Sequence, residues 1–238
     1  MYSNLTHLLR RSLDLLFPTI CLGCACRGPL LCPACWQTLA IPRPFRCIVC
    51  GREEPWGRTC VSCTREAGGI DGAWVVGEYA APLLRQAIGV FKYESVPALA
   101  QPLAGLLFSI LEREAVRRAR ARFGQTILVP VPMDRGRQRR RGFNHAALLA
   151  ATVSLLVDLP VADALEKQSR PAQTLLAPDE RLINLRGAIS VRQQLAVFAK
   201  TVILVDDVVT TGATARACAT ALRTAGARRV WLLTLARG

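Results

Sequence analysis

The stretch TVILVDDVVTTGAT, residues Thr201 to Thr214, decides the fold that we expect for this chain. Val202 to Val205 is an unbroken apolar run, which is typical of a strand buried on both faces of a parallel sheet. Asp206 and Asp207 follow directly, and a short loop then leads into an alanine-rich helix that we expect to run to about Ala225. The stretch therefore predicts a strand, two acids, a loop of small residues and a helix, in that order.

This order of elements predicts a site for a phosphorylated sugar. The loop from Thr210 to Thr214 contains Gly212, so its backbone N–H groups can approach a phosphate closely. The helix that follows offers unsatisfied N–H groups and the positive end of its dipole. The two carboxylates can accept hydrogen bonds from sugar hydroxyls or lie near a metal ion. A threonine-capped turn with two solvated acids is the plainer alternative.

Other apolar runs in the chain alternate with helical patterns. We expect one long helix from Pro97 to about Arg122 and another from His145 to Val157. Alternating strands and helices predict an α/β fold with a doubly wound, mostly parallel sheet. The further strands that we expect are Ala73 to Tyr79, Thr126 to Val131, Pro160 to Lys167, Ala188 to Val191 and Val230 to Leu235.

Positive charge is concentrated in the middle of the chain. The net charge is +14, which favours anionic partners such as nucleic acid or phosphorylated metabolites. Between Glu112 and Arg141 there are ten arginines and only three acids. The run from Arg135 to Arg141 follows a predicted strand, so we expect a basic loop at the sheet edge where α/β folds bind ligands. Arginine forks match phosphate oxygens. His145, beyond this loop, is expected at the surface of a helix start.

Eight of the ten cysteines form four C-x2-C pairs between Cys21 and Cys63. Two thiolates on a tight turn can share one ion, and two such pairs complete a four-thiolate zinc site. We therefore predict two structural zinc ions in a zinc-ribbon-like domain at residues 18–66, with Cys26 spare. Binding in chain order is the simplest arrangement, and an interleaved one stays open. The expected ligands are Cys21, Cys24, Cys32, Cys35, Cys47, Cys50, Cys60 and Cys63.

The segments on either side of the cysteine-rich segment suggest how the rest of the chain is divided. Residues 1–17 predict an amphipathic helix, residues 64–69 a hinge, and residues 70–238 the α/β domain. The leucines near the N-terminus do not form the apolar core of a signal peptide, and no apolar run reaches the length of a membrane span. Disulfides need an oxidising compartment, which nothing here signals. We therefore expect a cytoplasmic protein.

Together these motifs resemble the ComF family, bacterial proteins with an N-terminal zinc ribbon and a type I phosphoribosyltransferase domain. The resemblance covers nearly the whole chain. His145 departs from the pattern, in which glutamine is expected after RGFN. The motifs are the paired cysteines, Phe91-Lys92-Tyr93, the segment from Pro130 to Asn144, Gln173, Glu180-Arg181, Asn184 and LVDDVVTTGAT at Leu204 to Thr214.

The resemblance implies that the chain binds 5-phosphoribosyl 1-pyrophosphate (PRPP) with Mg²⁺. Its implied catalytic residues are Asp206, Asp207, Lys92 and Arg141. The implied PRPP-binding residues are Asp206, Asp207, Val208, Val209, Thr210, Thr211, Gly212, Ala213 and Thr214. The implied residues for pyrophosphate and the flexible loop are Arg137, Arg141, Asn144, Gln173, Arg181 and Asn184.

Three functions stay open at this point. The first is a phosphoribosyltransferase, a pentosyl-transferring glycosyltransferase, acting on a nucleobase-like or amine acceptor. The second is a competence factor that binds single-stranded DNA and works with the DNA-uptake machinery in natural transformation. The third is a regulator that senses PRPP without turnover. The sequence indicates neither the acceptor nor the oligomeric state.

Overall fold

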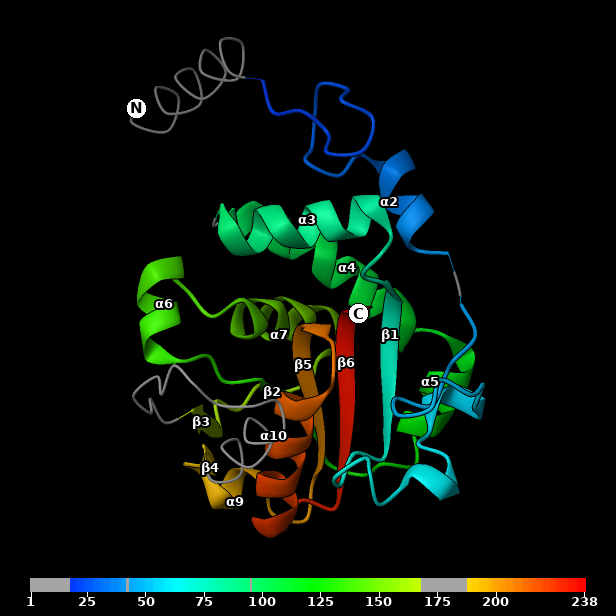
Figure 1. Cartoon of the computed structure of the whole chain (residues 1–238), viewed down its shortest axis with the longest axis vertical. Helices are drawn as coiled ribbons and strands as arrows, with labels where there is room; N and C mark the ends of the chain where they lie inside the picture. The colour runs from blue at the N-terminus through cyan, green and yellow to red at the C-terminus, as the bar shows by residue number, and fades with distance from the viewer. Residues whose placement is uncertain (1–17, 42, 95, 168–187) are drawn as a thin grey trace, which may run out of the picture.

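The computed structural model describes residues 18–41, 43–94, 96–167 and 188–238. At its centre is a four-stranded sheet in the order β1-β6-β5-β2, in which all neighbours run parallel (Figure 1). The apolar run predicted from the sequence lies in β5, between two neighbours, and Val202 to Val205 are each 0% exposed. The strands of this sheet are β1 (Gly72–Glu78), β2 (Thr126–Pro130), β5 (Thr201–Val209) and β6 (Arg229–Arg237).

A smaller antiparallel sheet lies beyond β2. It consists of β3 (Leu165–Lys167) and β4 (Ile189–Val191). An isolated parallel bridge between Leu128 and Val161 joins the chain before β3 to β2. The predicted strand from Pro160 to Lys167 is therefore a bridge followed by a short strand.

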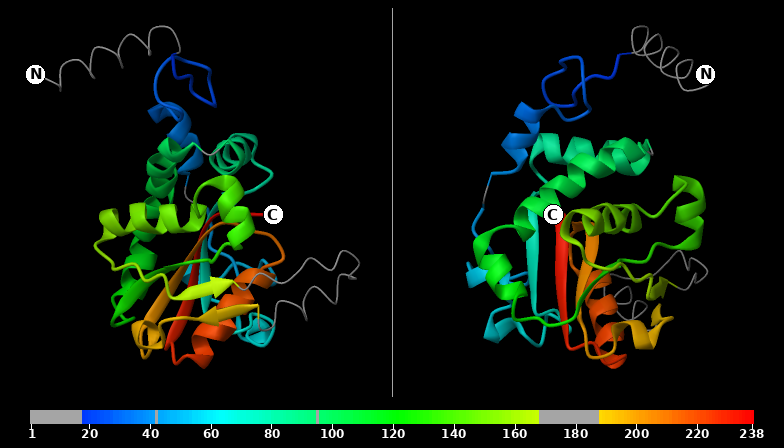
Figure 2. Two further views of the ribbon diagram at one scale, coloured as in Figure 1. Left: turned by 90° about the vertical axis from the view of Figure 1, so that its left-hand side faces the viewer. Right: turned by 180° about the vertical axis from the view of Figure 1, so that it is seen from behind.

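Helices cover both faces of the main sheet, as Figures 1 and 2 show. Helices α4 and α7 pack on one face, where Trp74, Trp231 and Leu103 belong to one apolar core. Helix α10 packs on the other face, where Val202 and Cys218 belong to a second core. This arrangement confirms the predicted doubly wound α/β fold. The longer helices are α2 (Pro33–Leu39), α3 (Pro82–Tyr93), α4 (Ala100–Leu111), α5 (Glu114–Arg120), α6 (Arg135–Arg141), α7 (His145–Val157) and α10 (Ala213–Thr224).

The long helix expected from Pro97 to Arg122 is broken. It consists of the 3-10 turn η3 (Pro97–Leu99), then α4 and then α5. The break lies at Arg113, whose ψ of 133° is not helical. The Arg113 side chain donates to the carbonyl of Arg43 at 2.7 Å, and its guanidinium lies 3.7 Å from the centre of the Phe45 ring. The helix is thus interrupted at the residue whose side chain contacts the cysteine-rich segment.

The basic loop expected at Arg135 to Arg141 is in fact helix α6. Asp134 is its N-cap, because Oδ1 of this residue accepts from the N–H groups of Gly136 at 2.9 Å and Arg137 at 3.2 Å. The helical spacing changes which arginines share a face. The amphipathic helix predicted at residues 1–17 lies outside the described residues. In the described part of the chain, no helix has both the length and the hydrophobicity to cross a bilayer.

The cysteine-rich segment lies along the outer edge of β1. Arg58 forms an antiparallel bridge with Gly72, and the Thr59 N–H donates to the carbonyl of Asp71 at 2.8 Å. Nε1 of Trp74 donates to the carbonyl of Trp56 at 2.9 Å. The segment therefore protects part of an edge strand that would otherwise present unpaired backbone groups.

Two further contacts hold this segment on the α/β core. Nε1 of Trp36, in α2, donates to the carbonyl of Pro102 in α4 at 2.8 Å. At the other end, the carbonyls of Gly68 and Gly69 accept from the α10 side chains of Thr220 at 3.2 Å and Arg223 at 3.1 Å. The residues expected to form a hinge are thus bonded to a helix of the core.

Gly57 makes the closest approach between the cysteine-rich segment and β1. Its φ is +81°, and a Cβ added there would lie 2.3 Å from the carbonyl oxygen of Ala73. We predict that Gly57→Ala lowers the free energy of unfolding by about 2 kcal/mol, because both the backbone conformation and the contact exclude a methyl group. Chemical denaturation followed by circular dichroism measures this. Gly89→Ala, in α3 with nothing within 4 Å, is the control. Equal losses in the two variants would contradict the assignment.

Candidate functional site

Asp206 and Asp207 lie within β5, which continues four residues beyond the predicted strand end at Val205. Successive side chains of a strand point to opposite faces, so Asp207 shares a face with Val205 and Asp206 shares a face with Leu204. Asp207 is only 7% exposed, and Asp206 is partly exposed. Burial and the neighbouring Asp207 carboxylate raise the pKa of Asp206 to about 8. The acid pair thus carries more negative charge than its surroundings readily accommodate.

Lys92 provides the positive charge nearest to this pair. Its Nζ lies 2.7 Å from Oδ1 of Asp207, and the two side chains are only 15% and 9% exposed. Lys92 comes from the last turn of α3, which lies across the carboxyl ends of the strands (Figure 1). Because both groups are largely out of water, removing either would leave a poorly compensated charge.

The loop after β5 has the geometry expected of a phosphate cradle. Gly212 precedes α10 with a φ of +71°, which glycine adopts at little cost. Thr210 and Thr211 are exposed, and Thr211 Oγ1 accepts from the Ala213 N–H at 3.4 Å. The N-terminus of the twelve-residue helix α10 therefore faces the same region as the acid pair.

Helix α6 presents two arginines to this region. Arg137 and Arg141 are four residues apart and share one helix face. The Arg141 guanidinium lies 5.0 Å from the centre of the Tyr93 ring. Asn144, the N-cap of α7, accepts from the Ala146 N–H at 3.1 Å and donates to the Val131 carbonyl at 3.2 Å. Asn144 thereby ties the start of α7 to the end of β2.

These groups surround one cavity of about 290 Å³, which we call the acid-pair cavity. Arg135, Arg139 and Arg140 do not line it, and the predicted loop residues Gln173, Arg181 and Asn184 lie outside the described residues. The predicted residues that line it are Lys92, Arg137, Arg141, Asn144, Asp206, Asp207, Val208, Val209, Thr210, Thr211, Gly212, Ala213 and Thr214.

Sequence reasoning missed three polar residues of the acid-pair cavity, Tyr93, Asp134 and Lys167. Two of them carry a recognisable signal. Asp134 is a helix-capping residue type before the arginine run, and Lys167 ends a predicted strand. Tyr93 belongs to the Phe91-Lys92-Tyr93 motif, but the motif alone does not indicate a role for it.

His145 is not the surface residue that the sequence suggested. It is 0% exposed, and its ring lies 4.6 Å from that of Phe143 and 4.9 Å from that of Phe91, measured between ring centres. Neither ring nitrogen has a hydrogen-bond partner among the described residues. Burial lowers the pKa of His145, which favours a neutral ring packed behind the acid-pair cavity.

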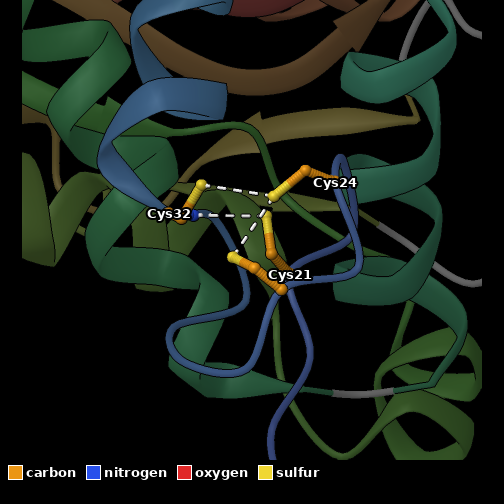
Figure 3. Close-up of side chains that lie close together, drawn as sticks. Cys21, Cys24 and Cys32 are labelled. Carbon is orange, nitrogen blue, oxygen red and sulfur yellow. Dashed lines mark hydrogen bonds between the residues drawn. The ribbon is translucent and has the colours of Figure 1, made fainter.

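The cysteines form two groups that follow chain order. In each group, four sulfur atoms lie within 4.8 Å of one another, which fits the four-thiolate coordination of zinc. Figure 3 shows Cys21, Cys24 and Cys32 of the first group with their sulfurs close together. The first group is Cys21, Cys24, Cys26 and Cys32, and the second is Cys47, Cys50, Cys60 and Cys63.

The first group differs from the prediction in one member. Cys26, expected to be spare, lies with its Sγ 3.2 Å from that of Cys24, because a tight turn brings the Cys21 N–H to the Cys26 carbonyl at 2.9 Å. Cys35, expected to be a ligand, is not in the group of four. Its thiol nevertheless lies beside the group, because a Cβ added at Gly23, between Cys21 and Cys24, would lie 2.6 Å from the Cys35 Sγ. Burial and the neighbouring thiols raise the pKa of Cys35 to about 12. Five thiols are thus available for four coordination positions.

Comparison with protein-family models gives two matches. The phosphoribosyl transferase domain matches residues 139–238, and the double zinc ribbon domain matches residues 12–64. The first match covers β5, α6 in part and α10. The second covers both cysteine groups, so both parts of the predicted organisation are supported.

Among curated proteins, Competence protein F of Haemophilus influenzae is 32% identical over 222 residues, covering 89% of this chain and 95% of that protein. The chain belongs to the ComF family. This ComF protein is also 30% identical to DNA utilization protein YhgH of Escherichia coli K12, over 86% of this chain and 96% of that protein. Competence protein ComFC of Bacillus subtilis is 27% identical, over 77% of this chain and 74% of that protein.

A solved structure of glutamine PRPP amidotransferase from B. subtilis is similar at 21% identity with a TM-score of 0.42. The match covers 61% of this chain and 30% of that chain.

We predict that this ComF protein binds two zinc ions per chain, one in each cysteine group. Cys50→Ser should reduce the content to one, because the second group has no fifth thiol among the described residues. Elemental analysis of the purified protein measures this, and Cys218→Ser, on the buried face of α10, is the control.

The first group should respond differently to substitution. Cys26→Ser and Cys35→Ser should each keep two zinc ions, because four thiols remain near the site, whereas the double variant should lose one. Loss of a whole zinc ion in either single variant would contradict the interchange of these two ligands.

Proposed function

We propose that this ComF protein binds PRPP with Mg²⁺ in the acid-pair cavity and transfers its phosphoribosyl group to an acceptor. One observation carries this proposal: the acid pair, the loop from Thr210 to Thr214 and the arginine face of α6 line a single cavity. These features suit the three parts of PRPP, which are the ribose hydroxyls, the 5-phosphate and the pyrophosphate. The family match to a phosphoribosyl transferase domain supports the same assignment.

The residues present fit a magnesium ion. Carboxylate oxygens are preferred Mg²⁺ ligands, and burial and the neighbouring Asp207 carboxylate, which raise the pKa of Asp206, are both effects that a bound divalent cation would offset. Asp206 and Asp207 would hold it, together with oxygens of PRPP. When bound, the ion would neutralise charge on the pyrophosphate as it leaves.

The reaction proposed is a displacement at C1 of the ribose. The bond from C1 to the pyrophosphate oxygen breaks, its electron pair leaves with pyrophosphate, and a nucleophilic atom of the acceptor forms the new bond to C1. Asp207 would orient the ribose hydroxyls, while Lys92, Arg137 and Arg141 would stabilise the negative charge that develops on pyrophosphate. The Lys92–Asp207 contact places a cation beside the acid that would hold the sugar. The acceptor would lose its proton to solvent or to a cavity carboxylate.

The names of the relatives point to a setting for this activity. Competence protein F and DNA utilization protein YhgH are named for the handling of DNA, and we propose a related role for this ComF protein. We also propose a cytoplasmic location, where cysteines stay reduced and can hold zinc. None of the ten cysteines forms a disulfide bond within the part of the chain that the structure describes.

A second candidate function is binding of single-stranded DNA by the outer face of α6. Arg135, Arg139 and Arg140 are exposed and do not line the acid-pair cavity. A cationic helix face suits a phosphate backbone, and such binding weakens steeply with salt. The double variant Arg139→Ala/Arg140→Ala should therefore weaken DNA binding and flatten its salt dependence. Unchanged binding by this variant would contradict the assignment.

The transferase proposal is tested by pyrophosphate release from Mg²⁺–PRPP in the presence of a panel of nucleobases and amines. Asp207→Ala should slow release by about a hundredfold, because the sugar loses its main anchor. Arg137→Ala should also slow release, whereas Arg139→Ala, on the same helix but outside the cavity, should not. Equal rates in wild type and Asp207→Ala would contradict the proposed site. PRPP binding without release for any acceptor would favour the PRPP-sensing alternative.

The pKa of Asp206 gives a separate prediction. With a pKa of about 8, its carboxyl is mostly protonated at neutral pH and becomes a second negative ligand as the pH rises. Affinity for Mg²⁺–PRPP should therefore rise between about pH 7 and 9, by at most about tenfold per pH unit, and then level off. Asp206→Asn should bind more weakly and lose this dependence. Calorimetric titration over the pH range measures it, and a flat profile in wild type would contradict it.

A further inference from the structure

A second cavity lies at the opposite edge of the main sheet from the acid-pair cavity. Its volume is about 790 Å³, within the range of small-molecule sites. One side is formed by residues just before β1, including Ile70, and by the first residues of β6, including Arg229. Helix α5 forms another side, and the cysteine-rich segment closes it with Arg58 and Val61. We call it the arginine cavity.

Positive charge in the arginine cavity greatly exceeds negative charge. Five arginines line it, with a single aspartate. That aspartate, Asp71, is already engaged, because its Oδ2 accepts from Nη2 of Arg223 at 2.5 Å and from the Val230 N–H at 2.7 Å. The lining arginines are Arg58, Arg118, Arg122, Arg223 and Arg229.

Two of these arginines have side chains available to a ligand. Arg58 and Arg122 are exposed, and neither guanidinium has an ion pair or hydrogen bond within the part of the chain that is described. Arg118 pairs at 2.5 Å with Glu114 on the solvent side, where both side chains are more than two-thirds exposed. Such a pair is easily exchanged for a better anionic partner. The arginine side chains thus line a cavity that contains no free carboxylate to neutralise them.

The remaining wall of the arginine cavity is Trp56, whose partly exposed ring is backed by the buried rings of Trp231 and Phe123, 1% and 4% exposed. Trp56 stacks on Trp231 with ring centres 5.5 Å apart and an interplanar angle of 21°. Phe123 lies 5.3 Å from Trp231, and the Arg229 guanidinium lies 5.4 Å from the Phe123 ring. The Trp56 backbone is held by the hydrogen bond from Trp74, so this wall is fixed. An inorganic anion could bind the arginines, but a contact with the ring of Trp56 would add nothing to its affinity.

We propose that the arginine cavity binds a nucleotide unit, with its base against Trp56 and its phosphate on Arg58 and Arg122. Aromatic rings with nearby guanidinium groups recognise both the flat base and the phosphate of a nucleotide. The site is separate from the acid-pair cavity, since it lies at the amino ends of the strands. The same chemistry is offered by a free mononucleotide and by one nucleotide of a single strand.

The cavity also gives the second cysteine group a role in ligand binding. Arg58, Thr59, Val61 and Thr64 line the cavity and alternate along the chain with Cys60 and Cys63. A zinc ion in that group would fix the wall that carries Arg58.

The experiment is calorimetric titration of zinc-loaded full-length protein with AMP, with adenosine, with inorganic phosphate and with a short oligodeoxyadenylate. AMP should bind at least about tenfold more tightly than adenosine or phosphate, because only AMP uses both walls. Arg58→Ala and Arg122→Ala should each weaken AMP binding about tenfold, as expected for a lost charge-assisted contact. The matched control is Arg117→Ala, which removes an exposed arginine of α5 that does not line the cavity.

Two arms separate this site from the acid-pair cavity and identify the source of the nucleotide. AMP affinity should be unchanged by Asp207→Ala and by saturating Mg²⁺–PRPP, and a loss in either case would place AMP in the acid-pair cavity and overturn the proposal. Binding of the oligonucleotide alone, with the same response to Arg58→Ala and Arg122→Ala, would support the site and identify a single strand as its source. Binding of neither ligand, or binding that these variants leave unchanged, would overturn it. Phosphate that binds as tightly as AMP would also overturn it.

Discussion

The ion pair between Lys92 and Asp207 joins the two main parts of the acid-pair cavity. Asp207 stands on a buried strand, where an isolated carboxylate would be strongly destabilised. Lys92 reaches it from the end of α3 at 2.7 Å. This contact requires α3 to lie across the carboxyl ends of the strands, which also brings Tyr93 beside Arg141. A lysine, two acids and the arginine face of α6 are therefore held around one space before any ligand binds.

The two cavities lie at opposite ends of the same parallel sheet. Strand β5 carries the acid pair at its carboxyl end, while the segment entering β1 and the amino end of β6 help to form the arginine cavity. The cysteine-rich segment contributes only to the second of these cavities, through residues beside Cys60 and Cys63. Its first part instead bonds to α4 through Trp36. The zinc ribbon thus contacts the core at several places along one side rather than at a single junction.

The sequence was most informative where one physical constraint dominates. The apolar run Val202 to Val205 has only one stable place, inside a sheet, and the acids after it could be located from that alone. The four C-x2-C pairs predicted two metal sites equally well, since few other structures place cysteines at this spacing. The fold class and the residues of the acid-pair cavity followed from these signals together with a family resemblance, while their chemical roles remain proposals.

Other features depended on contacts between distant parts of the chain, which the sequence does not display. The break at Arg113 occurs where its side chain reaches Arg43 and Phe45. Cys26 joins the first thiol group through a backbone turn that spacing alone did not distinguish from the position of Cys35. His145 is polar and was expected at the surface, yet two phenylalanines enclose it.

The proposed chemistry requires that the acid-pair cavity binds PRPP. The most direct measurement is calorimetric titration of Mg²⁺–PRPP into zinc-loaded protein, with Asp207→Ala as the paired sample. We expect micromolar binding at about one PRPP per chain in wild type and binding about a hundredfold weaker in the variant. Absence of binding in wild type, or equal affinity in the two proteins, would contradict the claim.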